Sequence, residues 1–465
     1  MRRSNNSCIA LIAAIAAFSG CATAPTRSDA PDIALPRAWT AQPGASATAP
    51  HAWLKDFNEP QLQALVDEAL AHNTDLHLAA ARFSQSVAEA RIAGAALMPS
   101  ADLGLNGARQ KINTFGPQST GGIRFDNYSL NLNLSWEIDL WGRLRNRTSA
   151  ALAQLEASHA ELCAAHLSLA AQVTKSWFNY IEASQQVALA EKDARSYHEN
   201  LKTIEGRFKH GLAEGLDLRR IRAQAASAEA DVEVRRRLLD QAARNLEVLL
   251  GRYPSAHLAV EDSLPDLPQT IPAGLPADLL TRRPDLIAAE RRLAAADKEY
   301  RATRKDLLPK ISLTASGGRS SPEFSDLLAN NFSTWTLAGN LTQPIFQGGR
   351  IRANIDRSLA LREQATANYH NAALNAFLEV ETTLAAETYL LNEYEKLALA
   401  SNEATAAETL AWNRYRNGTA ESLETLDAQR TATAARSRLL TLRNFLLQNR
   451  VDLYLALGGT FQSAS

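Results

Sequence analysis

His159, Cys163 and His166 stand at spacings of four and three residues, which on a helix places the three side chains on one face. Imidazole and thiolate groups are zinc ligands, and a structural zinc site needs four of them. Only the neighbouring Glu156 or Glu161 offers a carboxylate to complete the set. Packing at an Ala-rich helix interface explains the same residues without a ligand, and we favour that interpretation. We therefore expect no metal.

Glu424 and Asp427 form a second chemical pattern, two carboxylates three residues apart. On a helix this spacing stacks them one turn apart on one face. The spacing alone favours an ordinary solvated helix surface. The sequence contains no nucleophile-elbow motif and no glycine-rich phosphate-binding loop. It therefore predicts neither an enzyme nor a cofactor.

The elements that carry these residues occur twice in the chain. Ile138–Arg145 (IDLWGRLR) returns 207 positions later as Ile345–Arg352 (IFQGGRIR), and Pro99 returns 210 positions later as Pro309. Repeats of this length lie far outside solenoid periods, so they predict two copies of one large unit that pack about a pseudo-axis. The expected divisions are a signal peptide (1–20), a lipidated tether (21–58), a first repeat (59–251), a Pro-rich equatorial linker (252–276), a second repeat (277–459) and a C-terminal tail (460–465).

The N-terminus is typical of a secretion signal. Arg2 and Arg3 precede an apolar run, Ile9–Phe18, that is too short to span a membrane. The small residues before Cys21 resemble a bacterial lipoprotein signal, whose cysteine is lipidated and becomes the mature N-terminus. We favour lipidation of Cys21, which would anchor the chain in outer-membrane lipid, over an ordinary cleavage site beside a chance cysteine.

Composition excludes several other classes of protein. The net charge is −1, and no stretch of 18 apolar residues occurs, so we expect neither nucleic-acid binding nor a membrane-spanning helix. Cys163 is the one free thiol expected in the mature chain, so no intramolecular disulfide is possible.

Each repeat contains one helix far longer than a compact domain needs. Residues 143–205 and 350–417 lack both Gly and Pro and are rich in Ala, Leu, Glu and Arg, so we place long helices at 143–208 and 350–417. Shorter helical runs flank them at 61–97, 216–250, 277–308 and 419–457. We expect the two shorter runs of each repeat to stack end to end beside its long helix. Ala on all faces predicts close packing on two sides, as in a wall of helices.

Between these helices, apolar and polar residues alternate with a period of two. Tyr128, Leu130 and Leu132 fall on one face, while Asn and Ser fall on the other. We place strands at about 100–110, 126–138, 310–318 and 332–343. Such strands are long enough to cross a bilayer obliquely with a polar lumen, although a half-buried soluble sheet has the same pattern. Four strands cannot close a barrel, so chains must contribute jointly; the residues alone leave two chains with 8 strands and three with 12 both open.

Ser135–Arg143 (SWEIDLWGR) resembles the strand-to-helix signature of the outer-membrane efflux proteins, the TolC-type channels, in their lipoprotein (OprM/NodT-like) branch. Arg282–Leu286 (RRPDL), Gln343–Arg350 (QPIFQGGR) and Arg414–Arg430 also match the family pattern. The resemblance implies a mainly α fold with a β-barrel portion, built from a duplicated helix-hairpin-helix unit. It implies a homotrimer in which a 12-stranded transmembrane barrel continues into a 12-helix periplasmic tunnel.

The resemblance also assigns roles to single residues, with acidic rings closing the periplasmic aperture. The expected sites are the aperture (Asp217, Glu424, Asp427), the closed-state contacts (Tyr415, Arg416, Arg430), the adaptor-contact turns (Gly211, Leu216, Gly418, Leu423) and the barrel-tunnel junction (Asp139, Gly142, Arg143, Gly349, Arg350). Glycine in the turns is also explained as a helix cap.

The implied function is a passive exit duct for drugs or other small toxic compounds, opened by a periplasmic adaptor and an inner-membrane efflux transporter. Two alternatives remain open. The same channel could serve type I protein secretion, or the chain could be a periplasmic adaptor lipoprotein, although adaptors lack duplicated strands of membrane length.

Overall fold

The protein is described here from a computed structural model, for residues 38–41, 53–113, 122–258, 263–268, 276–328 and 330–459. The predicted signal peptide, Cys21 and the C-terminal tail lie outside these residues. The chain forms two compact units. Within the described residues, the first unit comprises Arg82–His159 and Ala288–Tyr369, and the second comprises the remainder.

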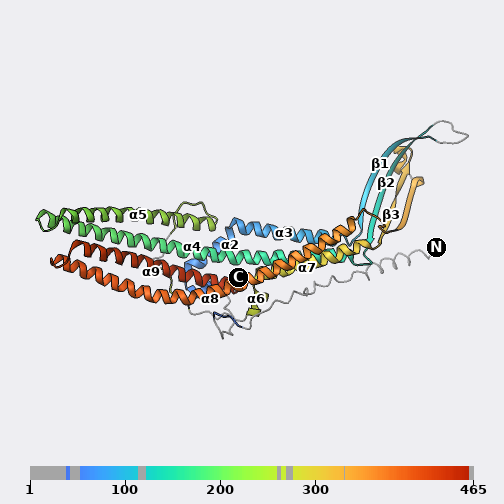
Figure 1. Cartoon of the computed structure of the whole chain (residues 1–465). Helices are drawn as coiled ribbons and strands as arrows, with labels where there is room; N and C mark the ends of the chain where they lie inside the picture. Colours follow the sequence, from blue (N-terminus) through green and yellow to red (C-terminus); the bar gives the residue numbers. More distant parts are fainter. Residues whose placement is uncertain are drawn as a thin grey trace. The chain divides into compact units, whose positions relative to one another are not determined.

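Helices make up most of the described chain, and the longest of them match between the repeats, with 67 residues in each long helix and 35 in each helix that follows it. The helices are α2 (Pro60–His72), α3 (Thr74–Ala95), α4 (Arg143–Lys209), α5 (Gly215–Leu249), α6 (Pro276–Arg282), α7 (Pro284–Arg304), α8 (Arg350–Arg416) and α9 (Ser422–Ala456). Short 3₁₀ segments are η1 (Trp53–Phe57), η2 (Lys305–Leu307), η3 (Phe324–Leu328) and η4 (Asn330–Phe332). In the second unit α5 runs beside α4, and α9 runs beside α8 (Figure 1). Among the described residues, no helix is both long enough and apolar enough to cross a membrane.

The shorter helical runs are interrupted, where the sequence predicts continuous segments. The first breaks at Asn73, whose side-chain oxygen accepts the backbone N–H groups of Asp75 at 2.9 Å and Leu76 at 3.1 Å. This bond pattern is that of a helix N-cap, and it starts α3. The second run breaks between Arg282 and Pro284, because proline favours the first helical position and disfavours helix before it.

Matching glycine turns end both long helices. Gly211 has φ +70° and Gly418 has φ +75°, in the left-handed region that glycine adopts without strain. The N–H of Leu212 donates to the carbonyl of Arg207 at 2.8 Å, and the N–H of Thr419 donates to the carbonyl of Arg414 at 2.9 Å. These bonds close Schellman caps, which reverse the chain and let α5 and α9 return.

The four strands form one antiparallel sheet of order β1-β2-β3-β4. The strands are β1 (Ser100–Ile112), β2 (Ile123–Ile138), β3 (Lys310–Ser321) and β4 (Ser333–Thr342). Each repeat supplies one hairpin, and β2 pairs with β3 to join the hairpins.

Side chains sort by chemistry onto the two faces of this sheet. One cross-strand row reads Leu103, Leu132, Gly317 and Trp335, and the neighbouring row reads Asp102, Asn133, Ser316 and Thr336. The apolar face is uncovered within one chain, since Leu103 is 73% exposed and Trp335 is 82% exposed. A contiguous exposed apolar face marks a surface that contacts lipid or protein.

Aromatic residues anchor the core of the second unit. The rings of Trp53 and Tyr454 stack at 5.5 Å, and Phe57 packs on Phe178 at 5.2 Å. Trp39 is also buried there, and the carboxylate of nearby Glu381 accepts the N–H groups of residues 40 and 41 at 2.7 and 3.0 Å.

The glycine turns give a test in which only backbone conformation changes. No atom lies within 4 Å of a Cβ built on Gly211, so Gly211→Ala should destabilise by about 1 kcal/mol through left-handed strain alone. Gly206, inside α4, also has open space around its Cβ but lacks a positive φ, so Gly206→Ala should stabilise by about 0.5–1 kcal/mol. Thermal melting of the extracted protein measures both. If both substitutions shifted the melting temperature equally and in the same direction, the left-handed conformation of Gly211 would be contradicted.

Candidate functional site

The predicted aperture residues lie where four helices of the second unit end or begin. An apolar cluster there takes residues from α4, α5, α8 and α9: Tyr197, Ile204, Leu218, Ile221, Ala225, Trp412, Tyr415 and Leu426. Its members come from both repeats, so burial of this cluster holds the ends of the two helical hairpins together.

Tyr415 is the centre of the polar contacts around this cluster. Arg207 donates from its guanidinium to the backbone carbonyl of Tyr415 at 2.5 Å and lies 4.7 Å from the centre of the Tyr415 ring. Burial raises the pKa of the Tyr415 phenol, and the charge of Asp217 adds to this rise against the opposing effect of Arg207. The structure therefore brings two predicted residues, Tyr415 and Asp217, together with Arg207, which was not predicted.

A second contact links the first turns of α5 and α9. The Ser422 hydroxyl donates to the carboxylate of Asp217. Asp217 also lies in the first turn of α5, where a negative charge is favourable to the helix dipole. Asp217 thus tethers one hairpin of the chain to the other.

Glu424 and Asp427 lie on α9 with each carboxylate paired to an arginine. Arg414 contacts Glu424 at 2.9 Å, and Arg430 contacts Asp427 at 2.6 Å. Both carboxylates are half exposed, at 51% and 59%. Each pair is therefore worth at most about 1 kcal/mol and exchanges readily with solvent or a partner. Arg416 is exposed, and within the described chain its guanidinium makes no ion pair.

The predicted closed-state contacts thus separate into three environments. Tyr415 is buried between the hairpins, Arg430 pairs with Asp427 on its own helix, and Arg416 faces solvent. Arg207 and Arg414 are equivalent positions of the two repeats but act differently. Arg207 reaches the other hairpin, whereas Arg414 stays within its own.

Both turns between the paired helices present leucine to solvent. Leu216 is 54% exposed and Leu423 is 52% exposed, at equivalent positions after Gly211 and Gly418. The arrangement leaves these side chains available to an apolar partner.

Farther along the hairpins, a buried ion cluster joins α4, α8 and α9. Arg436 contacts Asp193 and Glu408, each at 2.8 Å, and all three side chains are less than 20% exposed. Burial raises the pKa of Tyr197 to about 12, with the charges of Asp193 and Glu408 contributing. These residues were not predicted, because each is an ordinary charged residue on a long helix and only the fold pairs them.

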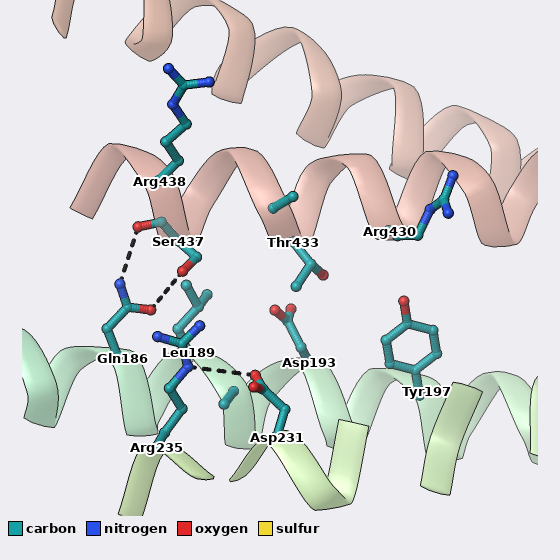
Figure 2. Close-up of a pocket in the computed structure, with 12 residues that line it drawn as sticks. Gln186, Leu189, Asp193, Tyr197, Asp231, Arg235, Arg430, Thr433, Ser437 and Arg438 are labelled. Atoms are coloured by element: carbon teal, nitrogen blue, oxygen red, sulfur yellow. Dashed lines mark hydrogen bonds and ion pairs between the residues drawn. The ribbon is translucent and has the colours of Figure 1, made fainter. Parts of the chain in front are cut away.

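The cluster borders a groove of about 420 Å³ between α4, α5 and α9, shown in Figure 2. Its walls carry both signs of charge, including Asp231 with Arg235 and the exposed Arg430 and Arg438. Gln186 and the backbone and side chain of Ser437 exchange hydrogen bonds at 3.1 and 2.8 Å across one end. A mixed-charge groove of this kind fits a polar helix surface better than an apolar ligand.

At the strand-to-helix junction in the first unit, Asp139 caps α4. Its carboxylate accepts the backbone N–H groups of Leu144 at 3.1 Å and Arg145 at 2.9 Å. Burial alone would raise the pKa of Asp139, but the donors on Arg145 and Leu144 outweigh it and hold the pKa below its usual range. Gly142 has φ +73° and turns the chain into the helix.

Arg143 joins the two repeats at this junction. Its buried guanidinium contacts Glu137 at 2.6 Å and Asp306 of η2 at 3.6 Å. Trp141 donates from its indole N–H to the carbonyl of Pro309 at 2.8 Å. The predicted junction residues of the first repeat are therefore brought together with residues of the second.

At the strand-to-helix junction of the second repeat, the equivalent side chains are exposed. Gly349 has φ +84°, like Gly142, but Arg350 is exposed and bonds to Gln347 at 2.5 Å. Where the first repeat has Asp139, the second has Phe346, which is 87% exposed.

Among the described residues, no group of three or more His, Cys, Asp and Glu is placed to hold a metal. His159 packs against the ring of Phe83 at 5.6 Å, burial lowers the pKa of His166, and Cys163 is exposed.

Charge at the Asp139 cap gives a pH-dependent prediction. The folded-state pKa of Asp139 is lowered, so the carboxylate stabilises the fold above about pH 4, and this contribution is lost as pH falls through the folded-state pKa. Asp139→Asn should cost about 1 kcal/mol at pH 7 and much less in acid. Melting temperatures at several pH values measure this. Glu395→Gln, at an exposed surface pair, should change little at any pH; a pH-independent loss for Asp139→Asn would contradict the charged cap.

Comparisons with known proteins agree with this architecture. The chain matches the family model described as outer membrane efflux protein over residues 65–252 and 275–459. It is 32% identical to the pyoverdine export outer membrane protein OpmQ of Pseudomonas aeruginosa, over 98% of this chain and 97% of OpmQ. It is also 32% identical to the cation efflux system protein CusC of Escherichia coli, over 98% of each chain. The solved outer-membrane channel OprN superposes with a TM-score of 0.85 at 27% identity, covering 92% of this chain and 98% of OprN.

Proposed function

Because this chain belongs to the outer membrane efflux protein family, we propose that it is the outer-membrane exit duct of a tripartite efflux assembly. Three copies would form the duct, and it would be opened at its periplasmic end by a periplasmic adaptor and an inner-membrane efflux transporter. The chain itself would carry out no catalysis. Energy for export would come from the partners.

The observation that carries this proposal is the set of contacts around Tyr415 and α9. Contacts between the hairpins hold the helix ends together, and Glu424 with Asp427 adds two carboxylates on one helix face. In a three-fold assembly, these carboxylates would form two stacked rings of three charges, which attract cations and hold water. Such an end can close, and parting the hairpins would open it.

Small compounds are the cargo that the relatives favour. One relative is named for export of pyoverdine and another for cation efflux, and both are 32% identical to this chain. Equal similarity to exporters of such different cargo fits a duct whose substrate is chosen by its partners. Type I protein secretion is the alternative for the same channel, and the adaptor alternative is disfavoured by the duplicated strands.

The contact between Arg207 and Tyr415 should keep the duct closed. Arg207→Met removes the hydrogen bond and the cation–π contact but keeps an apolar side chain, so it should raise the mean conductance in planar bilayers by about threefold or more. Arg219→Met, at an exposed arginine near the start of α5, is the matched control and should conduct like the native protein. If the two variants had equal conductance, Arg207 would not be a residue that keeps the duct closed.

The carboxylates on α9 should set ion preference at the aperture. Glu424→Ala combined with Asp427→Ala removes two charges per chain, so cation selectivity in a salt gradient should fall by roughly threefold or more. Glu395→Ala serves as the control, because that residue is exposed on α8 and pairs with its neighbour Lys396. Trimers that never conduct, in any variant, would refute the duct and support the adaptor alternative.

A further inference from the structure

The apolar face of the sheet becomes charged at the end of the first hairpin. Side chains alternate between the two faces of a strand, so every second cross-strand pair lies on the apolar face. From the end nearest the helices outward, these pairs are Leu103–Leu132, Leu105–Leu130, Gly107–Tyr128, Arg109–Asp126 and Lys111–Arg124. At the charged end, the pairs on the opposite face are uncharged, namely Gln110–Phe125 and Ile112–Ile123. Charge at this end is therefore confined to the face that carries the leucines.

Lys111 and Arg124, which we call the basic pair, repel each other. They are direct partners across β1 and β2, and like charges directly opposite each other destabilise a sheet. Within the described residues neither makes an ion pair, whereas Arg109 beside them pairs with Asp126 at 3.2 Å. Both members of the basic pair are exposed, so an anion from outside the chain can reach them. An anion bound between the two would replace the repulsion by attraction.

The second repeat shows that the hairpin does not need these charges. Offsets of 210 and 207 residues relate β1 to β3 and β2 to β4. They place Ser321, at the end of β3, at the position of Lys111, and Asn331, just before β4, at the position of Arg124. An equivalent hairpin therefore forms with two uncharged residues at these positions.

In the proposed outer-membrane location, the basic pair lies at the level of lipid headgroups. β2 continues toward α4 through Trp136, so Arg124 is near the end of the strand remote from the helices. Arg124 precedes Trp136 by 12 residues. This separation is roughly 40 Å along a strand and roughly 30 Å across a bilayer at a tilt of about 40°. The apolar band of such strands is about 25 Å tall, so a tryptophan at its periplasmic boundary puts Arg124 just beyond the hydrocarbon.

Aromatic rings lie between the leucines and the charges. Tyr128 stands between Leu130 and Asp126 on the apolar face, and its ring contacts that of Phe324 edge-on at 5.7 Å. Phe324 is 62% exposed. Aromatic side chains are typical of the level at which hydrocarbon meets headgroups. The order of leucine, aromatic ring and cation along the strands matches the order of acyl chain, interface and phosphate in a lipid.

We propose that the basic pair, together with Arg109, binds the phosphate groups of a glycolipid in the outer leaflet of the outer membrane. Arginine binds phosphate through two parallel N–H bonds, and lysine binds it as a point charge. Three cations beside the carboxylate of Asp126 leave a net charge of +2, which complements a doubly phosphorylated headgroup. The acyl chains of this lipid would pack on Leu103 and Leu105, which are 73% and 61% exposed.

The outer leaflet is the source of this lipid, because headgroups of the inner leaflet meet the other end of the strands. The inference rests on the proposed function, which places the remote end of the sheet at the cell surface. It adds a lipid-binding site and the chemical class of its ligand.

Binding of purified lipid A, a phosphorylated glycolipid, tests the site. The delipidated native assembly is titrated with bisphosphorylated lipid A, and bound lipid is measured by native mass spectrometry. Lys111→Ser with Arg124→Asn introduces the residues of the second repeat and should weaken binding by on the order of tenfold, because two phosphate-binding cations are lost. Lys396→Ser with Arg219→Asn removes the same charges at exposed positions on α8 and α5 and should bind like the native protein.

Two further measurements separate binding from folding. Lys111→Arg with Arg124→Lys keeps both charges and should bind lipid A nearly as well as the native protein. Without lipid, Lys111→Ser with Arg124→Asn should melt no lower than the native protein, because the repulsion is gone. Lipid A should raise the melting temperature of the native protein and not that of this variant. If the variant melted lower without lipid, the basic pair would stabilise the fold itself, and the lipid site would be overturned.

Other ligands test the assigned lipid. Monophosphorylated lipid A and phosphatidylglycerol should both bind more weakly than bisphosphorylated lipid A, because each brings less charge to the three cations. Inorganic phosphate at constant ionic strength should not displace lipid A, because it has no acyl chains to pack on the leucines. Equal binding of phosphatidylglycerol, or displacement by inorganic phosphate, overturns the glycolipid.

Conductance in planar bilayers separates this inference from the proposed function. A native protein that conducts but does not bind lipid A overturns the lipid site and leaves the duct standing. A protein that binds lipid A through the basic pair but conducts in no variant overturns the duct and supports the lipid site alone.

Discussion

Backbone hydrogen bonding at the two edges of the sheet is the constraint on which the rest of the structure depends. β1 and β4 each leave one row of N–H and C=O groups without a strand partner in the described chain. In hydrocarbon such groups have no water to bind, and leaving them unpaired costs several kcal/mol each. The proposed outer-membrane location therefore requires strands of other copies at both edges of this sheet. Each strand hairpin continues along the chain into a long helix, α4 or α8.

The two repeats differ in their contacts at the predicted functional residues. The glycine turns, helix lengths and hairpin registers are shared, so they specify the scaffold. Arg207 and Arg414 occupy equivalent positions, yet Arg207 contacts the other hairpin and Arg414 pairs with Glu424, a predicted aperture residue. Asp139 and Phe346 are likewise equivalent, yet Asp139 caps α4 and Phe346 is exposed. The duplication produced two similar scaffolds, and amino-acid differences at equivalent positions give the two scaffolds different contacts.

Much of the scaffold could be predicted from the sequence, because its signals are local. Runs without Gly and Pro coincide with α4 and α8, and period-two alternation coincides with the strands. The predicted family was confirmed by the comparisons, while its lipoprotein branch and the role of each aperture residue stay predictions. The contact of Arg207 with Tyr415 could not be foreseen, because it joins residues 208 positions apart and neither has a distinctive neighbourhood. The ion cluster of Arg436 was missed for the same reason.

Two ion pairs that join α4 to its neighbours differ in how strongly dissolved salt can reach them. Pairs between α4 and α5, such as Glu205 with Arg222, are exposed at 33% and 51%. The Debye length shortens from about 10 Å at 0.1 M salt to about 3 Å at 1 M, so concentrated salt weakens exposed pairs of this kind. The bridge between α4 and α9, Asp193 with Arg436, is only 7% and 19% exposed and is largely shielded from dissolved ions. Concentrated salt therefore weakens the Glu205–Arg222 pair between α4 and α5 more than the Asp193–Arg436 bridge between α4 and α9.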